Sequence, residues 1–179
     1  MTTAYDTIES PVGLLFIAAT EHGVTHIGFL DNERDLLPCV TRFEAETGES
    51  ATRGGPECHE VRRQLTEYFA GRRTAFELTL APNGTEWQRK VWHALSRIPK
   101  GETVAYGTIA TRLGRPSASR AVGAANGRNP IAIIVPCHRV VGSNGTLTGY
   151  AGGLHRKQWL LAHEGVRLAL DEPDAVLAG

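Results

Sequence analysis

The sequence predicts two consecutive domains, an α/β domain and then a mainly helical one, because the pattern of apolar residues changes once along the chain. Two apolar, partly β-branched runs, residues 12–20 and 24–30, flank a short turn that contains Gly23, which is typical of a β-hairpin. Beyond residue 84 apolar residues fall instead at helical spacing. The length of 179 residues fits one domain or two, so the change in the spacing of apolar residues, and not the length, predicts two domains. The expected parts are an N-terminal domain over 1–80, a C-terminal domain over 81–169 and an acidic tail over 170–179.

The first domain is expected to contain a helix and a further strand besides the hairpin. Over residues 60–70 apolar side chains recur at helical spacing, and Gly71 supplies a stop. Residues 75–80 alternate between apolar and polar types and predict a strand. Residues 44–56 are polar and rich in Gly, Ser and Thr, so we expect a surface loop there.

The second domain is expected to begin with a capped helix and to contain a helix-turn-helix. Thr85 and Gln88 have the spacing of a capping box. An apolar helical face follows, formed by Trp87, Val91, Trp92 and Leu95. Residues 99–101 end this helix, a short helix stops at Gly114, and another spans residues 116–127. Two short helices joined by a glycine-containing turn predict a helix-turn-helix.

The second helix of this pair has small side chains apart from one long cation, Arg120. Small residues allow close backbone approach, which fits either tight packing inside the domain or contact with DNA. The charge distribution bears on this choice. Residues 1–79 carry seven arginines against thirteen acids, a net charge of −6, whereas residues 80–166 carry eleven basic residues against three acids, a net charge of +8. A basic helical domain suits a polyanion, and a solvated surface without a partner is the alternative.

Composition predicts the compartment and the state of the thiols. No stretch approaches the roughly 18 to 20 unbroken apolar residues of a membrane helix, and the first residues lack the basic start of a signal peptide. Three cysteines are an odd number for a disulfide framework. We therefore expect a cytoplasmic protein without membrane contact, whose thiols are reduced.

The sequence Pro-Cys-His-Arg at residues 136–139 abruptly follows a buried apolar run. Its proline has no backbone donor and restricts the residue before it, so Cys137 is expected at a fixed bend that faces a pocket. A thiol with a pKa of about 8.5 needs a base or a nearby positive charge to react near neutral pH. His138 and Arg139 offer both.

His138 and Glu164 are expected to complete the activation of Cys137. Neighbouring residues of an extended chain point to opposite sides, so His138 would reach the sulfur through a local turn or, as we favour, one bridging water. A third group should orient the imidazole, and Glu164 lies on a helix near the C-terminus. Taken singly, each residue is also explained by a structural role, as a core thiol, a core histidine or a solvated helix-end carboxylate.

A series of short motifs stands in order between residues 85 and 165: Val91-Trp92, Ile98-Pro99-Lys100-Gly101-Glu102-Thr103, Tyr106-Gly107, Arg120-Ala121-Val122-Gly123, Asn129-Pro130, Val135-Pro136-Cys137-His138-Arg139-Val140, Gly149-Tyr150, Gly152-Gly153-Leu154 and His163-Glu164-Gly165. In this order they resemble the O6-alkylguanine-DNA alkyltransferases, also called methylguanine methyltransferases. So many ordered matches make the resemblance specific, whereas it is faint before residue 85.

The resemblance implies a fold, a reaction and roles for the matching residues. The N-terminal domain would be ribonuclease H-like, and the C-terminal domain would carry a winged helix-turn-helix. An alkyl group would pass from O6-alkylguanine in DNA to Cys137, irreversibly and once per molecule, with O4-alkylthymine an open second substrate. His138 and Glu164 would form a water-linked relay, Tyr106 would donate toward N3 of guanine, and Asn129 would tie the recognition helix to the active-site turn.

The resemblance also implies how double-stranded DNA containing O6-alkylguanine is held. Arg120 resembles the finger that replaces the extruded base. Further DNA contacts are expected at Ser119, Ala121, Gly123 and Arg128. The guanine pocket is expected at Val140, Tyr150 and Ala151, where backbone groups would read the base. The protein is expected to act as a monomer without a cofactor or metal, because displacement at an alkyl carbon needs neither and because Cys39, Cys58 and His59 lack the spacing of a zinc site.

Two other functions compete with this one. A cysteine hydrolase would use the same thiol but would turn over repeatedly. A non-enzymatic helix-turn-helix protein, either a regulator or an alkyltransferase-like lesion binder, would need no acceptor, and the lesion binders lack the cysteine present here. Trp87, Ala132 and Thr148 depart from the family pattern and leave the accepted alkyl size open.

Overall fold

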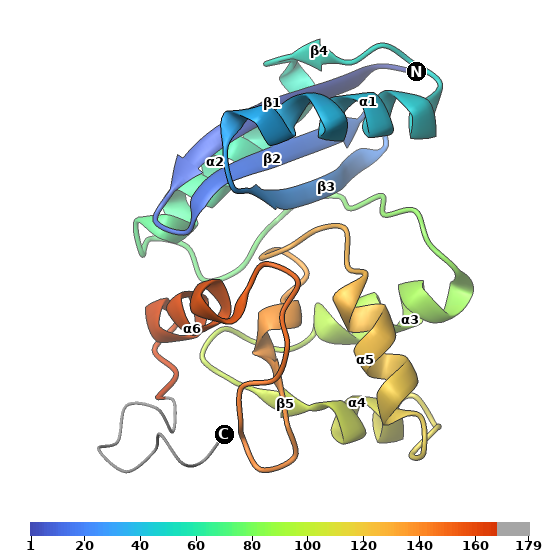
Figure 1. Ribbon diagram of the computed structural model, residues 1–179, viewed down its shortest axis with the longest axis vertical. Coiled ribbons are helices and arrows are strands. Elements are labelled where there is room, and N and C mark those ends of the chain that lie inside the picture. Colours follow the sequence, from blue (N-terminus) through green and yellow to red (C-terminus); the bar gives the residue numbers. More distant parts are fainter. Residues whose placement is uncertain (168–179) are drawn as a thin grey trace. The chain divides into compact units, whose positions relative to one another are not determined.

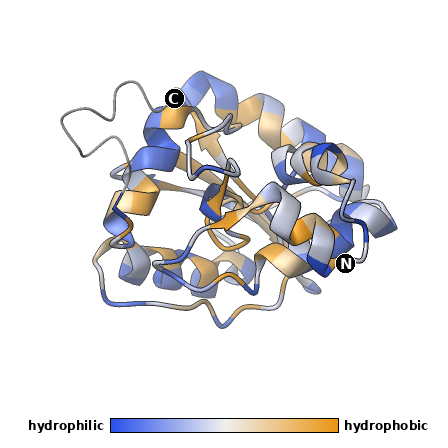
Figure 2. Cartoon of the chain, turned by 90° about the horizontal axis from the view of Figure 1, so that it is seen from below, coloured by the Kyte–Doolittle hydropathy of each residue, from blue (hydrophilic) through white to orange (hydrophobic). Residues whose placement is uncertain are grey.

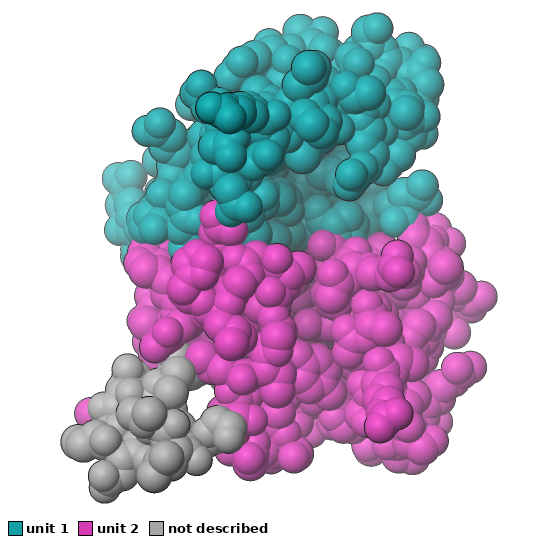
Figure 3. Space-filling view, viewed as in Figure 1, with its two compact units in different colours: residues 1–83, 130–132 teal, residues 84–129, 133–179 magenta. Residues whose placement is uncertain are grey.

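The computed structural model describes residues 1–167, and the tail predicted over residues 170–179 lies outside this range. The chain forms two compact units, which Figure 3 distinguishes by colour. The first unit contains Met1–Asn83 and Pro130–Ala132. The second contains Gly84–Asn129 and the described residues from Ile133 onward.

The first unit is built on a four-stranded sheet with the order β3-β2-β1-β4 (Figure 1). β1 (Thr3–Ser10), β2 (Gly13–Thr20) and β3 (Gly23–Leu30) are antiparallel neighbours, and the short β4 (Thr52–Arg53) pairs with β1 in parallel. The predicted hairpin is confirmed as β2 and β3. Gly23 has a φ of 135°, and a Cβ atom there would lie 2.5 Å from a backbone oxygen, so this turn requires glycine.

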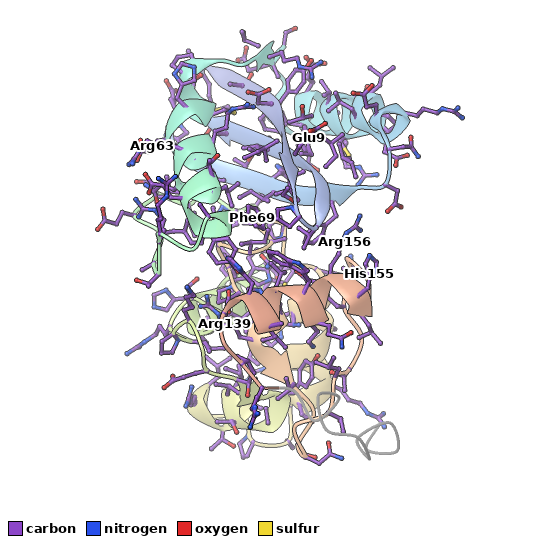
Figure 4. The ribbon with its side chains drawn as sticks, turned by 90° about the vertical axis from the view of Figure 1, so that its left-hand side faces the viewer. Glu9, Arg63, Phe69, Arg139, His155 and Arg156 are labelled. Carbon is purple, nitrogen blue, oxygen red and sulfur yellow. The ribbon has the colours of Figure 1, made fainter. Side chains whose placement is uncertain are left out.

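Helices cover both faces of this sheet. α1 (Leu36–Thr47) and α2 (His59–Phe69) lie on opposite sides of it (Figure 4). One face packs against α1 through a cluster of Phe16, Ala18, Leu30, Val40 and Phe43. Leu15 and Ile17 of β2 alternate with that set and are fully buried on the other face. The helix predicted over residues 60–70 is confirmed as α2.

Two predictions for the first unit are wrong. Residues 75–80 do not form a strand. At Glu77 the backbone bonds to a side chain and not to a strand, because Gln64 Nε2 donates to the Glu77 carbonyl (3.1 Å) and the Glu77 amide donates to Gln64 Oε1 (2.9 Å). Leu80 alone of this segment bridges to β3. Residues 44–56 are not one loop, since α1 extends to residue 47 and β4 occupies residues 52–53.

The second unit is helical apart from one short parallel strand pair. Its elements are α3 (Glu86–Leu95), β5 (Val104–Ala105), α4 (Tyr106–Arg112), α5 (Ser119–Gly127), β6 (Val140–Val141) and α6 (Leu154–His163), with β5 paired to β6. The capping box is confirmed, because Thr85 Oγ1 accepts from the Gln88 amide (3.1 Å) and Gln88 Oε1 from the Thr85 amide (2.9 Å). α4 and α5 are the predicted pair of short helices. Figure 2 shows that the helices carry both hydrophobic and hydrophilic residues, as packing on one face requires.

Candidate active site

Cys137 lies on a tight turn whose backbone is fixed on both sides. Pro136 has φ −82° and ψ 64°, and the Cys137 amide donates to the Val135 carbonyl (2.8 Å), which closes an inverse γ-turn. A short 3-10 helix, Cys137–Arg139, follows, with the Arg139 amide donating to the Pro136 carbonyl (2.9 Å). The bend predicted at Cys137 is therefore present.

Two asparagines hold this turn, Asn126 in the last turn of α5 and Asn129 just beyond its end. Asn129 Nδ2 donates to the Val135 carbonyl (2.8 Å), and the buried Asn126 donates through Nδ2 to the Cys137 carbonyl (3.5 Å). Ile133, which lies between Asn129 and Cys137 in the sequence, has a φ of 73°, which is strained for a β-branched residue, and it is only 1% exposed. The sequence analysis singled out Asn129 but missed Asn126, because nothing in a helix of small residues indicates that its amide reaches a distant carbonyl.

His138, Arg139 and Glu164 form a buried network. His138 Nε2 lies 2.9 Å from Glu164 Oε2, and both side chains are fully buried. Arg139 binds the same carboxylate through Nε to Oε1 (2.7 Å) and Nη2 to Oε2 (3.0 Å), and donates from Nη1 to the Ile98 carbonyl (2.6 Å). Figure 4 shows Arg139 beside α6, at whose C-terminal end Glu164 lies. The structure thus brings His138 and Glu164 together as predicted.

This network fixes the protonation of His138. Burial alone would raise the pKa of Glu164, but hydrogen bonds from His138 and Arg139 hold it well below its ordinary value, so the carboxylate is ionised. Burial lowers the pKa of His138 against the opposing effect of Glu164, so the imidazole is neutral near pH 7. A carboxylate only accepts hydrogen bonds, which places the imidazole proton on Nε2. Nδ1 is then an unprotonated acceptor, and it has no hydrogen-bond partner among residues 1–167.

The Cys137 thiol is protonated in this environment. Burial raises its pKa, whereas hydrogen bonds with Asn129 and Tyr150 and the charge of Lys157 act in the opposite sense. The thiol must therefore lose a proton before it can act as a nucleophile. The other two cysteines are also free thiols, and burial raises the pKa of Cys58 to about 12.

Lys157 is a buried cation that the sequence analysis missed. Its Nζ donates to the carbonyls of Val140 (2.7 Å) and Thr148 (3.3 Å), and the residue has no exposed surface. Burial lowers its pKa to about 8, and the neighbouring Cys137 opposes this effect. The expectation that Arg139 supplies positive charge to the thiol is wrong, because its guanidinium binds Glu164 and the Ile98 carbonyl. Among the described cations, it is Lys157 whose charge lowers the pKa of Cys137.

The predicted pocket residues lie on the segments around this turn. The Tyr106 hydroxyl, at the start of α4, lies 2.9 Å from Thr148 Oγ1. Val140 is buried, and its amide donates to the Cys137 carbonyl while its carbonyl accepts from Lys157. Tyr150 is half-buried and Ala151 is exposed.

The predicted DNA contacts lie at the surface. Ser119, Arg120, Ala121 and Arg128 are exposed, and Gly123 is half-buried. A Cβ atom added at Gly123 would lie 3.8 Å from the Tyr106 ring, an ordinary contact, so that α5 lies next to Tyr106. The exposed side of α5 is therefore close to the pocket residues.

The described residues contain no group of three or more His, Cys, Asp or Glu side chains that could hold a metal ion. Every helix within residues 1–167 is too short or too polar to cross a membrane.

The fold and the site together define a class of protein. Its members carry a buried cysteine next to a buried His-Glu pair, in a helical unit that also contains two short helices joined by a turn. The family model described as "6-O-methylguanine DNA methyltransferase, ribonuclease-like domain" matches residues 3–82, and "6-O-methylguanine DNA methyltransferase, DNA binding domain" matches residues 86–166. The chain belongs to the 6-O-methylguanine DNA methyltransferase family. The predicted resemblance and the predicted succession of an α/β domain and a helical domain are thereby confirmed.

Relatives and solved structures agree over nearly the whole chain. The methylated-DNA--protein-cysteine methyltransferase of Methanosarcina acetivorans is 48% identical over 161 residues, which cover 90% of this chain and 97% of the relative. That of Salmonella typhimurium is 47% identical, covering 90% and 95%. The crystal structure of Mycobacterium tuberculosis O6-methylguanine methyltransferase has a TM-score of 0.77 at 42% identity and covers 99% of this chain and 100% of that one. A structure of the Mycobacterium tuberculosis protein in complex with DNA has the same TM-score and identity, with 97% of each chain covered.

Proposed function

We propose that this protein repairs alkylated DNA by direct reversal, transferring the alkyl group of O6-alkylguanine to Sγ of Cys137. The observation that carries the proposal is the buried relay in which Glu164 holds His138 with Nδ1 unprotonated, one residue from the thiol. The names of the relatives given above support the reaction class. O4-alkylthymine has the same alkyl-oxygen chemistry and is a second substrate to test.

The relay supplies the base that a protonated thiol needs. His138 takes the thiol proton at Nδ1, through one bridging water, and Glu164 stabilises the imidazolium that results. Sγ then attacks the alkyl carbon, forming the S–C bond as the C–O6 bond breaks. The departing guanine takes up one proton in place of the alkyl group and the imidazolium of His138 gives one up, so the products are a thioether, guanine and neutral His138. Tyr106 donates a hydrogen bond toward N3 and stabilises the departing base.

The reaction consumes the protein. A thioether, unlike an acyl-enzyme, is not hydrolysed by water, so each molecule accepts one alkyl group. This separates the proposal from a cysteine hydrolase. Incubation with a tenfold excess of O6-methylguanine duplex should stop at one repaired lesion per protein, and continued turnover would contradict the proposal.

DNA engagement is assigned to a winged helix-turn-helix in which α5 is the recognition helix. Flipping the target nucleotide costs a few kcal/mol, and Arg120 on the exposed side of α5 would offset part of that cost by filling the gap in the stack. Ser119, Ala121, Gly123 and Arg128 would contact the DNA around it. Val140, Tyr150 and Ala151 would line the pocket for the flipped base. We further propose a cytoplasmic monomer, and the free thiols fit a reducing compartment.

A further inference from the structure

Two tryptophans of α3 fix the position of α5. Trp92 Nε1 donates to the Ala125 carbonyl (2.8 Å), a buried bond. Trp87, half-buried and more than one turn earlier on α3, donates through Nε1 to the Ala121 carbonyl (3.2 Å), next to Arg120. The two accepting carbonyls are four residues apart and so lie along one line of α5. α5 is thereby attached to α3 at two successive turns. The two helices are neighbours in the ribbon of Figure 1.

The Trp87 ring also holds a cation. The guanidinium carbon of Arg115 lies 5.1 Å from the centre of the ring, within the range of a cation-π contact. Arg115 belongs to the turn between α4 and α5, and its backbone is fixed: its amide donates to the Ala110 carbonyl (2.9 Å), and its carbonyl accepts from the Ala118 amide (2.9 Å). The first bond, together with the bond from Gly114 to Thr111, is a Schellman motif that ends α4.

Arg115 has no acidic partner in the part of the chain that the structure describes. It is exposed, and no carboxylate of residues 1–167 forms an ion pair with it. A guanidinium held over an aromatic ring by a cation-π contact keeps N–H donors available, and this contact lowers the entropy lost when those donors bind an anion. Its location in the turn before the recognition helix suits a phosphate of the strand that this helix would contact.

We propose that Arg115 binds a DNA phosphate at the edge of the recognition surface, and that Trp87 is the positioning residue for both Arg115 and α5. This inference rests on the proposed function, since it requires that α5 bind duplex DNA. The indole N–H of Trp87 positions α5, and its ring face positions Arg115. The alternative is that Trp87 and Arg115 only pack against each other and do not contribute to DNA binding.

Equilibrium binding to an unmodified duplex as a function of salt concentration tests the phosphate contact. Loss of one phosphate contact should reduce the magnitude of the slope of log K against log salt by about 0.9, and near 0.1 M salt this corresponds to about eightfold weaker binding. Arg115→Ala should show this change. Arg34→Ala, an exposed arginine of the first unit, is the matched control and should bind as the wild type does. An unchanged slope for Arg115→Ala overturns the contact.

The role of Trp87 is tested by a double-mutant cycle. Trp87→Leu removes the ring and should lower the slope toward that of Arg115→Ala, and the two substitutions together should cost less than their sum. Trp87→Phe keeps a ring for Arg115 and should retain the wild-type slope, while the lost N–H bond to Ala121 slows alkyl transfer from duplex DNA. Additive costs in the cycle, or a Trp87→Phe slope equal to that of Arg115→Ala, overturn the positioning role.

Failure of the inference and failure of the proposed function are distinguishable. The wild-type preparation is also incubated with an O6-methylguanine duplex, and uptake of the methyl group is measured. A wild type that takes up no methyl group refutes the proposed function. A wild type that is methylated while Arg115→Ala keeps the full salt slope refutes this inference alone.

Discussion

Nε2 of His138 lies 2.9 Å from Oε2 of Glu164, with both side chains fully buried. The carboxylate therefore determines which imidazole nitrogen carries the proton, and the other nitrogen is left as a base. Arg139 binds the same carboxylate and keeps it ionised. The chemistry proposed for Cys137 depends on this relationship.

The first prediction concerns the pH dependence of alkyl transfer from a free O6-alkylguanine base. The thiol proton passes to the imidazole inside the protein, so the neutral pair and the imidazolium-thiolate pair hold the same number of protons. The fraction of reactive thiolate then does not depend on pH. The rate should therefore be constant between the lowered pKa of His138 and the raised pKa of Cys137. On the acid side the rate should fall only once His138 itself is protonated. Stopped-flow rates from pH 5 to 9 measure this profile, and a rate rising about tenfold per pH unit through 7 to 9 would indicate a thiol ionised by solvent instead.

The second prediction concerns Glu164→Gln. The amide cannot stabilise an imidazolium, so the single-turnover rate should fall by about 10- to 100-fold. The substitution also leaves the buried Arg139 without its carboxylate, so the melting temperature should fall as well. DNA affinity should change little, because the carboxylate is buried away from the surface. Glu102→Gln, an exposed acid of the same unit, is the control. An unaltered rate in folded Glu164→Gln protein removes Glu164 from the mechanism.

The third prediction concerns Lys157. Its Nζ is buried between two carbonyls, and its charge favours the thiolate of Cys137. Lys157→Met keeps the length of the side chain but removes the charge, so the thiol pKa should rise and alkyl transfer should slow by about tenfold. Ultraviolet titration of the thiolate and rates with free base check both effects, with Lys90→Met on the surface as control. A thiol pKa equal to that of the wild type would refute this electrostatic role.

The fourth prediction separates base extrusion from chemistry at Arg120. Arg120→Ala should react with alkylated duplex DNA at least about tenfold more slowly, because flipping loses its partner in the stack. A free O6-alkylguanine base needs no flipping and should react at the wild-type rate. Single-turnover rates at saturating DNA check this. Equal losses toward base and duplex would place Arg120 in the chemistry or the fold, and full recovery at saturating DNA would show that it only attracts phosphate; either result contradicts a role in base extrusion.

The parts of the fold predicted from the sequence are those encoded by local patterns. Turn residues at Gly23 and the Thr85-Gln88 capping box indicate where elements begin, and both occur as predicted. Residues 75–80 alternate like a strand, but the distant Gln64 side chain takes the backbone bonds of Glu77 in the middle of the segment. β1 was not predicted, because Asp6, Thr7 and Glu9 obscure its apolar pattern; it is a strand because β2 pairs with it.

The residues of the site likewise divide into those that the sequence indicates and those that only the folded chain brings together. The sequence around Cys137 indicated the bend, and the ordered motifs indicated His138 and Glu164, which lie 26 residues apart. Lys157 was missed because a lysine on a helix ordinarily points to solvent, and only the folded chain encloses it. Arg139 was assigned to the thiol because it is near in sequence, whereas its donors reach Glu164 and the Ile98 carbonyl.

The measurement that tests the central claim most directly is the mass of the protein and of its peptides after reaction with an O6-methylguanine duplex. Of the three free thiols, Cys137 alone has the His138 relay beside it, and burial raises the pKa of Cys58 to about 12. We expect the mass of one methyl group to be added per protein, located on the Cys137 peptide, and no addition in Cys137→Ala. A methyl group on Cys39 or Cys58, or repair of the DNA with no change in protein mass, would contradict the account.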